Sequence, residues 1–567
     1  MTKEKEFDTQ SVTLSGVVAL IGAEDHSHAA RRLKAKFPEL EWVDHNSTDN
    51  VPEHVATISL RTDPALHEGA FTINTDTGGS APKVEMAGGP FSGVIYGVEE
   101  LIQRKRPSTK ESAELTFAAG LRCPDLPYRS FWTWDHSTNW NLEQIGQQEI
   151  GVFNPYGKPP EGFLSDYMRA VDFCSENRIG GIIVYGFLRD SHGGVSSAKA
   201  LCDYANDRGV RIIPGIAIGA YGGVYWEGPS KYNLASWLGD NPSTKAQAEG
   251  AIGFQIEDLD FPLSFPQSEY TLSACPSDPK TIDWMEEAVS WLAETFAIGG
   301  VNIESGDYGV CGCDRCLARR GDNDDPSRRQ EQLESWSHAD LTHNFPRLFD
   351  AIRSRRSDAW VYCELQWDNL LDKSSGQAFE AMPPDAIYQH TVNRSYWNRV
   401  CSELAPGALN EFPQSRNALR THIASQWSGD YRTERYRDNS MDVMGLAREG
   451  AALGFKGLTM WGEASPHNVP VELNYLAFSR FGFDASLEWA EFFNDTVAPL
   501  FGGHAEATQF VDILSKADEE SRPNKAAILA LQNLTVEALS QAHDQSVGRW
   551  IWLAEHLSRR QRMAPDS

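Results

Sequence analysis

The stretch AIGGVNIESGDYGVCGCDRC, residues 297–316, joins a short apolar run to two carboxylates and three cysteines. Residues 300–303 have the apolar character of a buried strand, and Glu304 and Asp307 follow them closely. In an α/β barrel, catalytic side chains gather at the C-terminal ends of the strands. The stretch therefore predicts one barrel strand with a functional site at its end.

Strand-like and helical segments alternate on both sides of this stretch, at the spacing typical of βα units. Right-handed crossovers between eight parallel strands make a (β/α)8 TIM barrel the economical solution. In this α/β fold residues 300–303 form the fourth strand. The eight expected strands cover residues 128–133, 180–187, 211–223, 300–303, 359–367, 386–392, 421–427 and 456–465.

The remaining sequence predicts a small N-terminal α/β domain and a helical C-terminal region around the barrel. Before the barrel, β-branched runs at 11–22 and 55–62 and a hairpin pair at 69–76 and 83–89 alternate with two helical segments, 26–38 and part of 91–105. After the barrel the apolar residues keep helical spacing to the C-terminus. The expected domains are residues 1–120, 121–485 and 486–567.

Charge and hydropathy exclude several classes of partner. The 567 residues include 51 Lys and Arg against 79 Asp and Glu, a formal charge of -28, which would repel a nucleic-acid backbone. No window approaches the roughly 18 apolar residues of a membrane helix. The first residues, MTKEKEFDTQ, lack the apolar core of a signal peptide, so we expect a cytoplasmic protein, or a secreted one whose leader is not part of this sequence.

Three of the nine cysteines, Cys311, Cys313 and Cys316, fall within six residues. Such close spacing indicates a metal site more than a disulfide framework. Zinc prefers four ligands in structural sites, and Cys275 in LSACPSDP is the candidate for the fourth. Because four protein ligands leave no open position for water, we expect this zinc to hold a loop in place and not to catalyse. No organic cofactor is expected.

Carboxylates at several expected strand ends indicate hydrolysis of a glycosidic bond, which requires one protonated and one ionised carboxyl group. Glu304 directly follows an apolar strand, and burial raises the pKa of a carboxyl group as a general acid requires. The second carboxylate is left open among Asp307, Glu364 and Glu463. Asp135 and Asp368 lie further from the strands.

Aromatic and polar residues near the expected strand ends are candidates for binding sugar, because aromatic faces suit the apolar faces of sugar rings. Several tryptophans have this position, and any one of them could instead be a core residue: Trp134, Trp140, Trp226, Trp367, Trp397, Trp427 and Trp461. The substrate-binding candidates are Trp134, Asp135, His136, Tyr185, Trp367, His390, Asn393, Arg394, Trp427 and Trp461. Arg394 would suit an acidic sugar.

Four motifs carry a resemblance to known glycosidases. FSGVIYGVEELIQRK, residues 91–105, resembles the helix that closes the N-terminal domain of β-hexosaminidases and α-glucuronidases, and GGVNIESGDYG resembles the fourth-strand segment of α-glucuronidases. That resemblance implies that Glu304, with Asn302 two residues before it, is the general acid. CPSDP and DYGVCGCDRC resemble a group of bacterial glycosidase-like barrels with the same cysteine cluster, in which an Asp at position 307 recurs. The adjacent Asp-Glu pair of β-hexosaminidases is absent, since Ser305 follows Glu304.

The sequence therefore predicts an exo-acting glycoside hydrolase that removes a terminal sugar, which could be uronic or sulfated, from a carbohydrate. Glu304 would be the acid. Two alternatives remain: a carbohydrate-binding barrel without catalysis, and a metal-dependent hydrolase built on Asp135 and His136. The C-terminal helices are candidates for contacts in a homo-oligomer.

Overall fold

A computed structural model describes most of the chain, and the structural statements that follow concern these residues. The described ranges are 9–105, 112–135, 137–141, 159–220, 222–247, 273–304, 311–321, 329–365, 370–371, 382–408, 416–425, 437–518 and 523–565. None of the described helices is long and apolar enough to cross a membrane.

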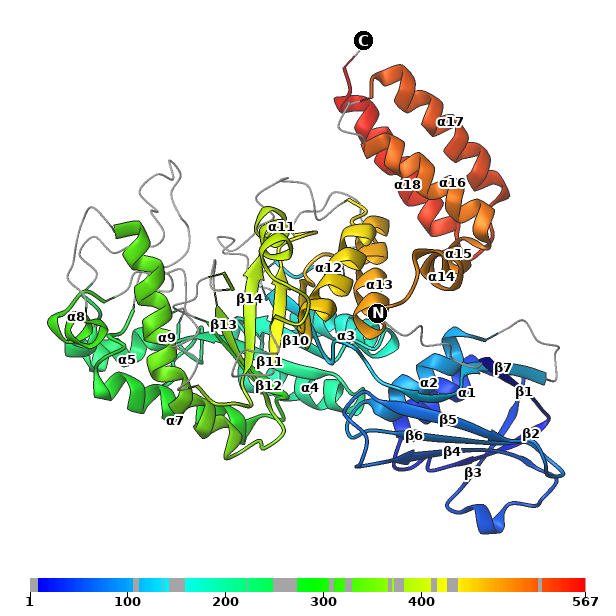
Figure 1. Cartoon of the computed structure of the whole chain (residues 1–567), viewed down its shortest axis with the longest axis horizontal. Coiled ribbons are helices and arrows are strands. Elements are labelled where there is room, and N and C mark those ends of the chain that lie inside the picture. The colour runs from blue at the N-terminus through cyan, green and yellow to red at the C-terminus, as the bar shows by residue number, and fades with distance from the viewer. Residues whose placement is uncertain are drawn as a thin grey trace.

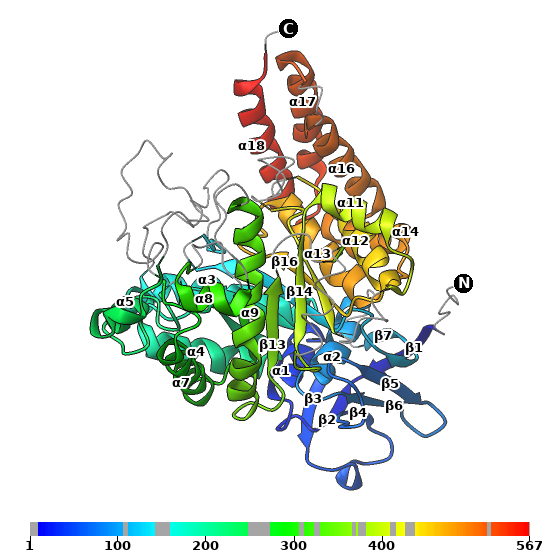
Figure 2. The same ribbon diagram turned by 60° about the vertical axis from the view of Figure 1, so that its left-hand side comes forward.

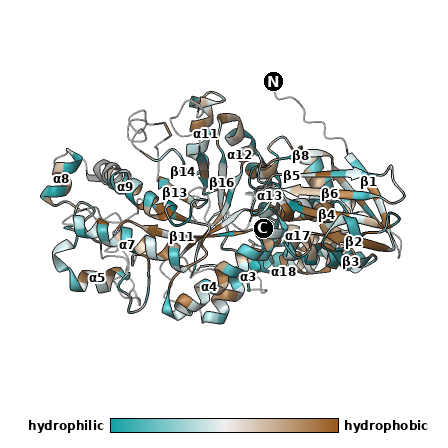
Figure 3. Ribbon diagram, turned by 90° about the horizontal axis from the view of Figure 1, so that it is seen from below, coloured by the Kyte–Doolittle hydropathy of each residue, from teal (hydrophilic) through white to brown (hydrophobic). Residues whose placement is uncertain are grey.

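Eight parallel strands close into a barrel in the order β10-β11-β12-β13-β14-β15-β16-β9, which confirms the predicted (β/α)8 architecture (Figure 1). Nearly all of their residues are buried, as expected for parallel strands covered on both faces. Figure 3 shows hydrophobic residues along β11, one of the central strands. The barrel strands are β9 (Tyr128–Trp134), β10 (Gly181–Tyr185), β11 (Arg211–Ala217), β12 (Gly300–Glu304), β13 (Trp360–Leu365), β14 (Ile387–Val392), β15 (Asn417–Thr421) and β16 (Gly457–Trp461).

Amphipathic helices cover the outside of the barrel. Helix α7 is an example of how the sequence starts such a helix. Asp278 caps it by accepting from the Lys280 N–H at 3.0 Å, and Pro279 occupies its first turn. Trp284, Ala288 and Leu292 then repeat at helical spacing and are buried in the main core. The helices are α3 (Pro160–Glu176), η2 (Asp190–His192), α4 (Gly194–Asp207), α5 (Leu234–Asp240), η3 (Pro242–Thr244), α7 (Pro279–Thr295), α8 (Asp314–Arg320), α9 (Arg329–Arg353), α11 (Arg394–Glu403), α12 (Ser440–Leu453) and α13 (Val469–Phe483).

The seventh barrel strand lies earlier in the chain than the sequence predicts. The prediction of residues 421–427 was wrong: β15 spans Asn417–Thr421 and pairs in register with β14, from Tyr388 opposite Asn417 to Val392 opposite Thr421. After Thr421 the chain turns, and Ala424 has a φ of 62° that a strand cannot contain. The shift of the strand places Arg420 inside the barrel.

Before the barrel the chain forms a six-stranded sheet, ordered β3-β2-β4-β6-β5-β8, and a separate pair, β1 with β7. The run predicted as one strand at 11–22 is split at Gly16, whose φ of 66° sends β1 and β2 into different sheets. The antiparallel pair β5 and β6 confirms the predicted hairpin. The elements are β1 (Thr9–Ser15), β2 (Val17–Ile21), α1 (Ser27–Lys36), β3 (Glu41–His45), η1 (Thr48–Asn50), β4 (Ala56–Thr62), β5 (Phe71–Asp76), β6 (Lys83–Gly88), α2 (Gly93–Gln103), β7 (Ser112–Ala118) and β8 (Gly120–Arg122).

The C-terminal region is helical, as predicted, and its helices α16 to α18 project beside the barrel (Figures 1 and 2). Phe501, Phe510 and Trp550 pack together inside it. The hydrophobic core of the N-terminal domain also includes Phe483, at the end of α13. The N-terminal domain and α13 therefore share buried surface. The domain boundaries at 120 and 485 stay a prediction. The elements are α14 (Trp489–Phe492), the π-helix η8 (Phe493–Val497), α15 (Ala498–Phe501), α16 (His504–Asp518), α17 (Lys525–Gln541) and α18 (Val547–Met563).

Candidate active site

Two predicted catalytic residues, Glu304 and Glu364, lie opposite each other inside the barrel. They are register partners on the neighbouring strands β12 and β13. Side chains alternate between the two faces of a strand, and here the inward positions are polar: Asn302 and Glu304 on β12, and Glu364 on β13. Glu304 is 3% exposed and Glu364 is fully buried. The closed sheet therefore brings together two of the carboxylates that the sequence placed at separate strand ends.

The hydroxyl group of Tyr185, at the end of β10, is shared between these two carboxylates. It lies 2.9 Å from Glu304 Oε2 and 3.2 Å from Glu364 Oε2. Asn302 Nδ2 donates to the same hydroxyl oxygen at 2.7 Å and to Glu364 Oε2 at 2.6 Å. Burial, together with the nearby charges of Glu304 and Glu364, raises the pKa of Tyr185 well above its ordinary value. Tyr185 therefore stays protonated and donates one hydrogen bond.

Glu364 is surrounded by hydrogen-bond donors. Besides Tyr185 and Asn302, Trp132 Nε1 donates to its Oε2 at 3.1 Å and Gln389 Nε2 donates at 3.2 Å. Arg420 forms an ion pair with its Oε1. These contacts fix the position of the Glu364 carboxyl group inside the barrel.

Aromatic rings line the interior beside the carboxylates. Trp132 contacts Tyr185 and Trp461 with ring centroids 4.6 and 4.3 Å apart, and Trp134 lies edge-on to Trp226 at 5.6 Å. All four tryptophans, with Tyr185, belong to one buried cluster within the barrel. Trp134, Trp226 and Trp461 therefore lie in a buried cluster beside the carboxylates, and sugar binding by Trp134 and Trp461 stays a prediction.

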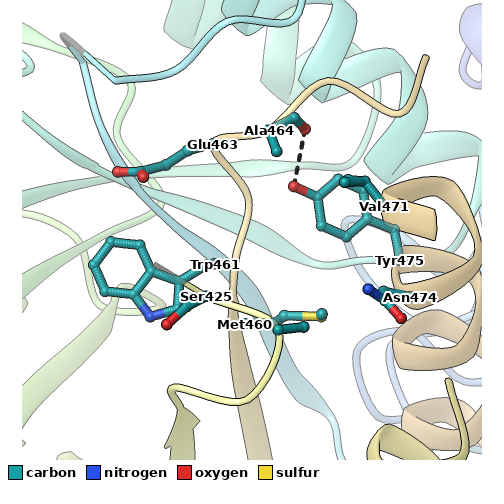
Figure 4. Close-up of a pocket in the computed structure, with 9 residues that line it drawn as sticks. Ser425, Met460, Trp461, Glu463, Ala464, Val471, Asn474 and Tyr475 are labelled. Carbon is teal, nitrogen blue, oxygen red and sulfur yellow. Dashed lines mark hydrogen bonds between the residues drawn. The ribbon is translucent and has the colours of Figure 1, made fainter. Parts of the chain in front are cut away.

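Glu463, the third described candidate carboxylate, is held by the loop after β9. Its Oε1 accepts from the backbone N–H of Trp134 at 2.8 Å and from Ser137 Oγ at 2.7 Å. Figure 4 shows the side chains of Trp461, at the end of β16, and Glu463, two residues later, pointing to the same side of the backbone, away from Tyr475. A pocket lies here, lined by Ala424, Ser425, Met460, Trp461, Glu463, Ala464, Val471, Asn474 and Tyr475. Through these contacts Glu463 helps to hold Trp134 and Ser137, at the end of β9 and just after it, in position.

Asp135 is fully buried and contacts two residues that follow β10, forming an ion pair with Arg189. Arg189 Nε lies 2.8 Å from Asp135 Oδ2, and His192 Nδ1 lies 3.2 Å from the same atom. The Arg189 guanidinium also stacks on Trp226 at 5.3 Å. Asp135 therefore orients the neighbouring loop and its aromatic wall.

Three further candidates, on β14 and α11, have structural contacts. His390 Nε2 lies 3.0 Å from Asn417 Oδ1, and burial lowers the pKa of His390 to about 4. Asn393 caps helix α11, its Oδ1 accepting from the Tyr396 N–H at 2.8 Å. Arg394 pairs with Asp442 at 2.8 Å.

The remaining candidates divide into two groups. Trp140 and Trp397 are core residues: their ring nitrogens donate to Gly462 O and Glu449 Oε2, both at 2.7 Å. The other predicted residues, Asp307, His136, Trp367, Asp368 and Trp427, lie outside the described residues.

Comparison with solved structures identifies the fold. A GH138 enzyme targeting pectin rhamnogalacturonan II superposes with a TM-score of 0.56 at 13% identity, covering 92% of this chain and 56% of that one. CpGH84B superposes with a TM-score of 0.52 at 11% identity, covering 98% and 88%. The chain shares the fold of glycosidase barrels. It spans little more than half the length of the GH138 enzyme. By sequence, no protein-family model and no curated protein matches it.

The four cysteines predicted to bind metal come together beside this glycosidase-like barrel. The sulfurs of Cys275, Cys311, Cys313 and Cys316 all lie within 4.8 Å of one another. Cys275 Sγ is 3.5 Å from Cys316 Sγ and 3.7 Å from Cys313 Sγ. Four ligands at a zinc–sulfur distance of about 2.3 Å would place their sulfurs about 3.8 Å apart. The donor set and its spacing therefore fit a tetrahedral metal ion.

Hydrogen bonds join the cysteines to one another and to the backbone. The Gln247 backbone N–H donates to Cys311 Sγ at 3.4 Å. Hydrogen bonds among the thiol groups lower the pKa of Cys316 and raise that of Cys275. The loop of Cys275 also joins the barrel, because the Ala274 N–H donates to Gly219 O at 2.7 Å, just after β11. A bound ion would thus fasten α8 and the loop after β12 to the loop after β11.

The sequence reasoning missed three residues of the barrel interior: Trp132, Gln389 and Arg420. Each is a polar or amphipathic side chain at an inward position of a strand, on β9, β14 and β15. Gln389 stands in the predicted strand 386–392 and was not singled out there. Arg420 was missed because the predicted seventh strand began after it.

Proposed function

We propose that this chain is an exo-acting, retaining glycoside hydrolase in which Glu304 is the general acid and base and Glu364 is the nucleophile. The observation that carries the proposal is the Tyr185 hydroxyl group held between the two carboxylates. This hydroxyl group joins two acidic side chains of neighbouring strands. Both lie toward the C-terminal ends of the strands, where the catalytic residues of barrel enzymes gather. The shared fold agrees with this but does not establish it.

The distances favour retention over inversion. Both Oε2 atoms lie within 3.2 Å of the same hydroxyl oxygen. They are therefore separated by no more than about 6 Å, short of the roughly 6.5–9.5 Å that leaves room for water in inverting enzymes. Retaining enzymes have carboxyl groups about 5–5.5 Å apart, because the second carboxylate attacks the sugar directly.

The environments of the two residues suit different roles. Arg420 and the hydrogen-bond donors around Glu364 hold its carboxyl group in a fixed position, as direct attack on the anomeric carbon requires. In the first step Glu364 forms a bond to the anomeric carbon, the bond to the leaving oxygen breaks, and Glu304 gives its proton to that oxygen. In the second step water gives a proton to Glu304, its oxygen bonds to the anomeric carbon, and Glu364 leaves as a carboxylate.

The tryptophan cluster supports a sugar as the substrate, since Trp134, Trp226 and Trp461 present aromatic rings near the carboxylates. A terminal acidic sugar remains part of the proposal, although Arg394, which suggested it, pairs with Asp442. The GH138 enzyme of the same fold targets pectin rhamnogalacturonan II. Pectic oligosaccharides therefore belong among the substrates tested.

We further propose that the four cysteines hold a structural zinc ion. All four positions of a tetrahedral ion would be occupied by Cys275, Cys311, Cys313 and Cys316, so the ion would brace the loops without contacting substrate. Contacts between chains through the C-terminal helices also stay a prediction. Leu529 and Val536 on α17 and Ile551 on α18 are exposed apolar residues there.

The test of the proposed function is a screen of aryl glycosides, aryl uronides and pectic oligosaccharides with the wild type, Glu304→Gln and Glu364→Gln. Glu287→Gln, at a surface position on α7, is the matched control. We expect turnover by the wild type and the control, and large losses in the two site variants. Proton NMR of the first product anomer distinguishes retention from inversion. A wild type without turnover, or full activity of Glu304→Gln, would refute the proposal.

A further inference from the structure

The Tyr185 hydroxyl group has one hydrogen atom and two carboxylate acceptors. Glu304 Oε2 and Glu364 Oε2 lie at 2.9 and 3.2 Å, both within hydrogen-bond distance, but only one can receive that hydrogen at a time. Asn302 Nδ2 donates to the Tyr185 oxygen at 2.7 Å and thereby occupies one of its lone pairs. Among the described residues, the acceptors within reach of the hydroxyl hydrogen are these two carboxylates.

The ring of Tyr185 is held so that this hydroxyl group stays in place. It packs against Trp132 and Trp134, with centroids 4.6 and 5.0 Å away. On the adjacent strand, Gly215 leaves the space that the ring needs, because a Cβ atom there would lie 2.4 Å from Tyr185 Cδ2. The ring is thus confined, while rotation about the C–O bond still moves the hydrogen atom between the two acceptors.

We propose that Tyr185 is a positioning residue that exchanges its hydrogen-bond acceptor between the two steps of the reaction. The inference rests on the proposed function. Before the first step, Glu304 is protonated and the Tyr185 hydroxyl group donates to ionised Glu364. Once Glu364 is bonded to the sugar it carries no charge, and the hydroxyl group turns to ionised Glu304. When Glu364 leaves in the second step, the hydroxyl group is available to it again.

Loss of the Tyr185 hydroxyl group should affect the rates of the two steps unequally. In the first step the hydroxyl group stabilises the nucleophile before attack, so removing it costs little. In the second step it stabilises the carboxylate charge that develops on departing Glu364, so removing it slows that step. Tyr185→Phe should therefore accumulate the glycosyl-enzyme.

The kinetic test compares Tyr185→Phe with Tyr362→Phe on the aryl glycoside that gives turnover in the screen. Tyr362 is the matched control: it is also buried inside the barrel, but its hydroxyl group bonds to neutral Ser130 at 3.0 Å. For Tyr185→Phe we expect kcat to fall by about tenfold or more and KM to fall with it, so that kcat/KM changes by less than about threefold. A burst of aryl product and a covalent adduct in the mass spectrum should accompany this change.

The outcomes separate the two proposals. No turnover by the wild type refutes the proposed function and the exchange together. Glu304-dependent turnover, with kcat and kcat/KM falling equally in Tyr185→Phe, refutes the exchange alone.

Discussion

Arg420 and Glu364 form an ion pair inside the barrel, with β14 between the strands that carry them. The side chain of Arg420 is 7% exposed and that of Glu364 is fully buried. The guanidinium group also lies over the ring of Trp132, 4.3 Å from its centroid. Loss of either partner would leave a charge buried without its counterpart.

Replacing Arg420 with Met should destabilise the fold by about 3–5 kcal/mol, because Glu364 would remain buried without its cation. Unfolding by urea, followed by circular dichroism, measures this change. The double variant with Glu364→Gln should be less destabilised than the two single changes predict together. Arg31→Met provides the control, since its partner Asp207 is exposed and such pairs contribute about 1 kcal/mol or less. Equal losses at Arg420 and Arg31 would contradict the prediction.

Glu304→Gln should slow hydrolysis of an aryl glycoside with a poor leaving group by about 10²–10⁴-fold, because protonation of the leaving oxygen is lost. With a strongly acidic phenol as the leaving group, the first step needs no proton and should be much less affected. Steady-state and burst kinetics on a pair of such substrates measure the difference. The same loss on both substrates would exclude Glu304 as the general acid.

Cys316→Ser should remove most of the bound metal and lower the melting temperature, because three thiolates no longer close the tetrahedral shell. Elemental mass spectrometry of the purified protein should find about one zinc per chain in the wild type. Cys401→Ser, at a cysteine on α11 outside the cluster, should keep the metal. Wild-type protein with four freely titrating thiols and no metal would disprove the site.

His390 should make the fold sensitive to acid. Burial lowers its pKa from 6.5 to about 4, so the folded protein favours the neutral ring. Its contribution to stability is therefore complete above about pH 6.5, and up to about 3 kcal/mol is lost as the pH falls toward 4. His390→Gln should flatten the stability profile in this interval, measured by denaturant unfolding at several pH values. The same change at exposed His504 is the control, and an unchanged profile for His390→Gln would refute the prediction.

Local patterns determined the elements and the fold class. Apolar runs of strand length, alternating with amphipathic helices, predicted the barrel, and residues 297–316 placed Glu304 at the end of β12. The spacing of Cys311, Cys313 and Cys316 predicted a site for a metal ion, and the structure brings Cys275 to them. These features depend on neighbours in the chain, which is why the sequence alone could predict them.

Only the closed barrel decided which side chains meet. The register of β12 against β13 sets Glu304 opposite Glu364, and β10 brings Tyr185 to both. The position of Arg420 inside the barrel follows only from the pairing with β14, which places β15 at Asn417–Thr421. Contacts between strands depend on register and closure, which arise from hydrogen bonds between residues distant in the chain and leave no local pattern in the sequence.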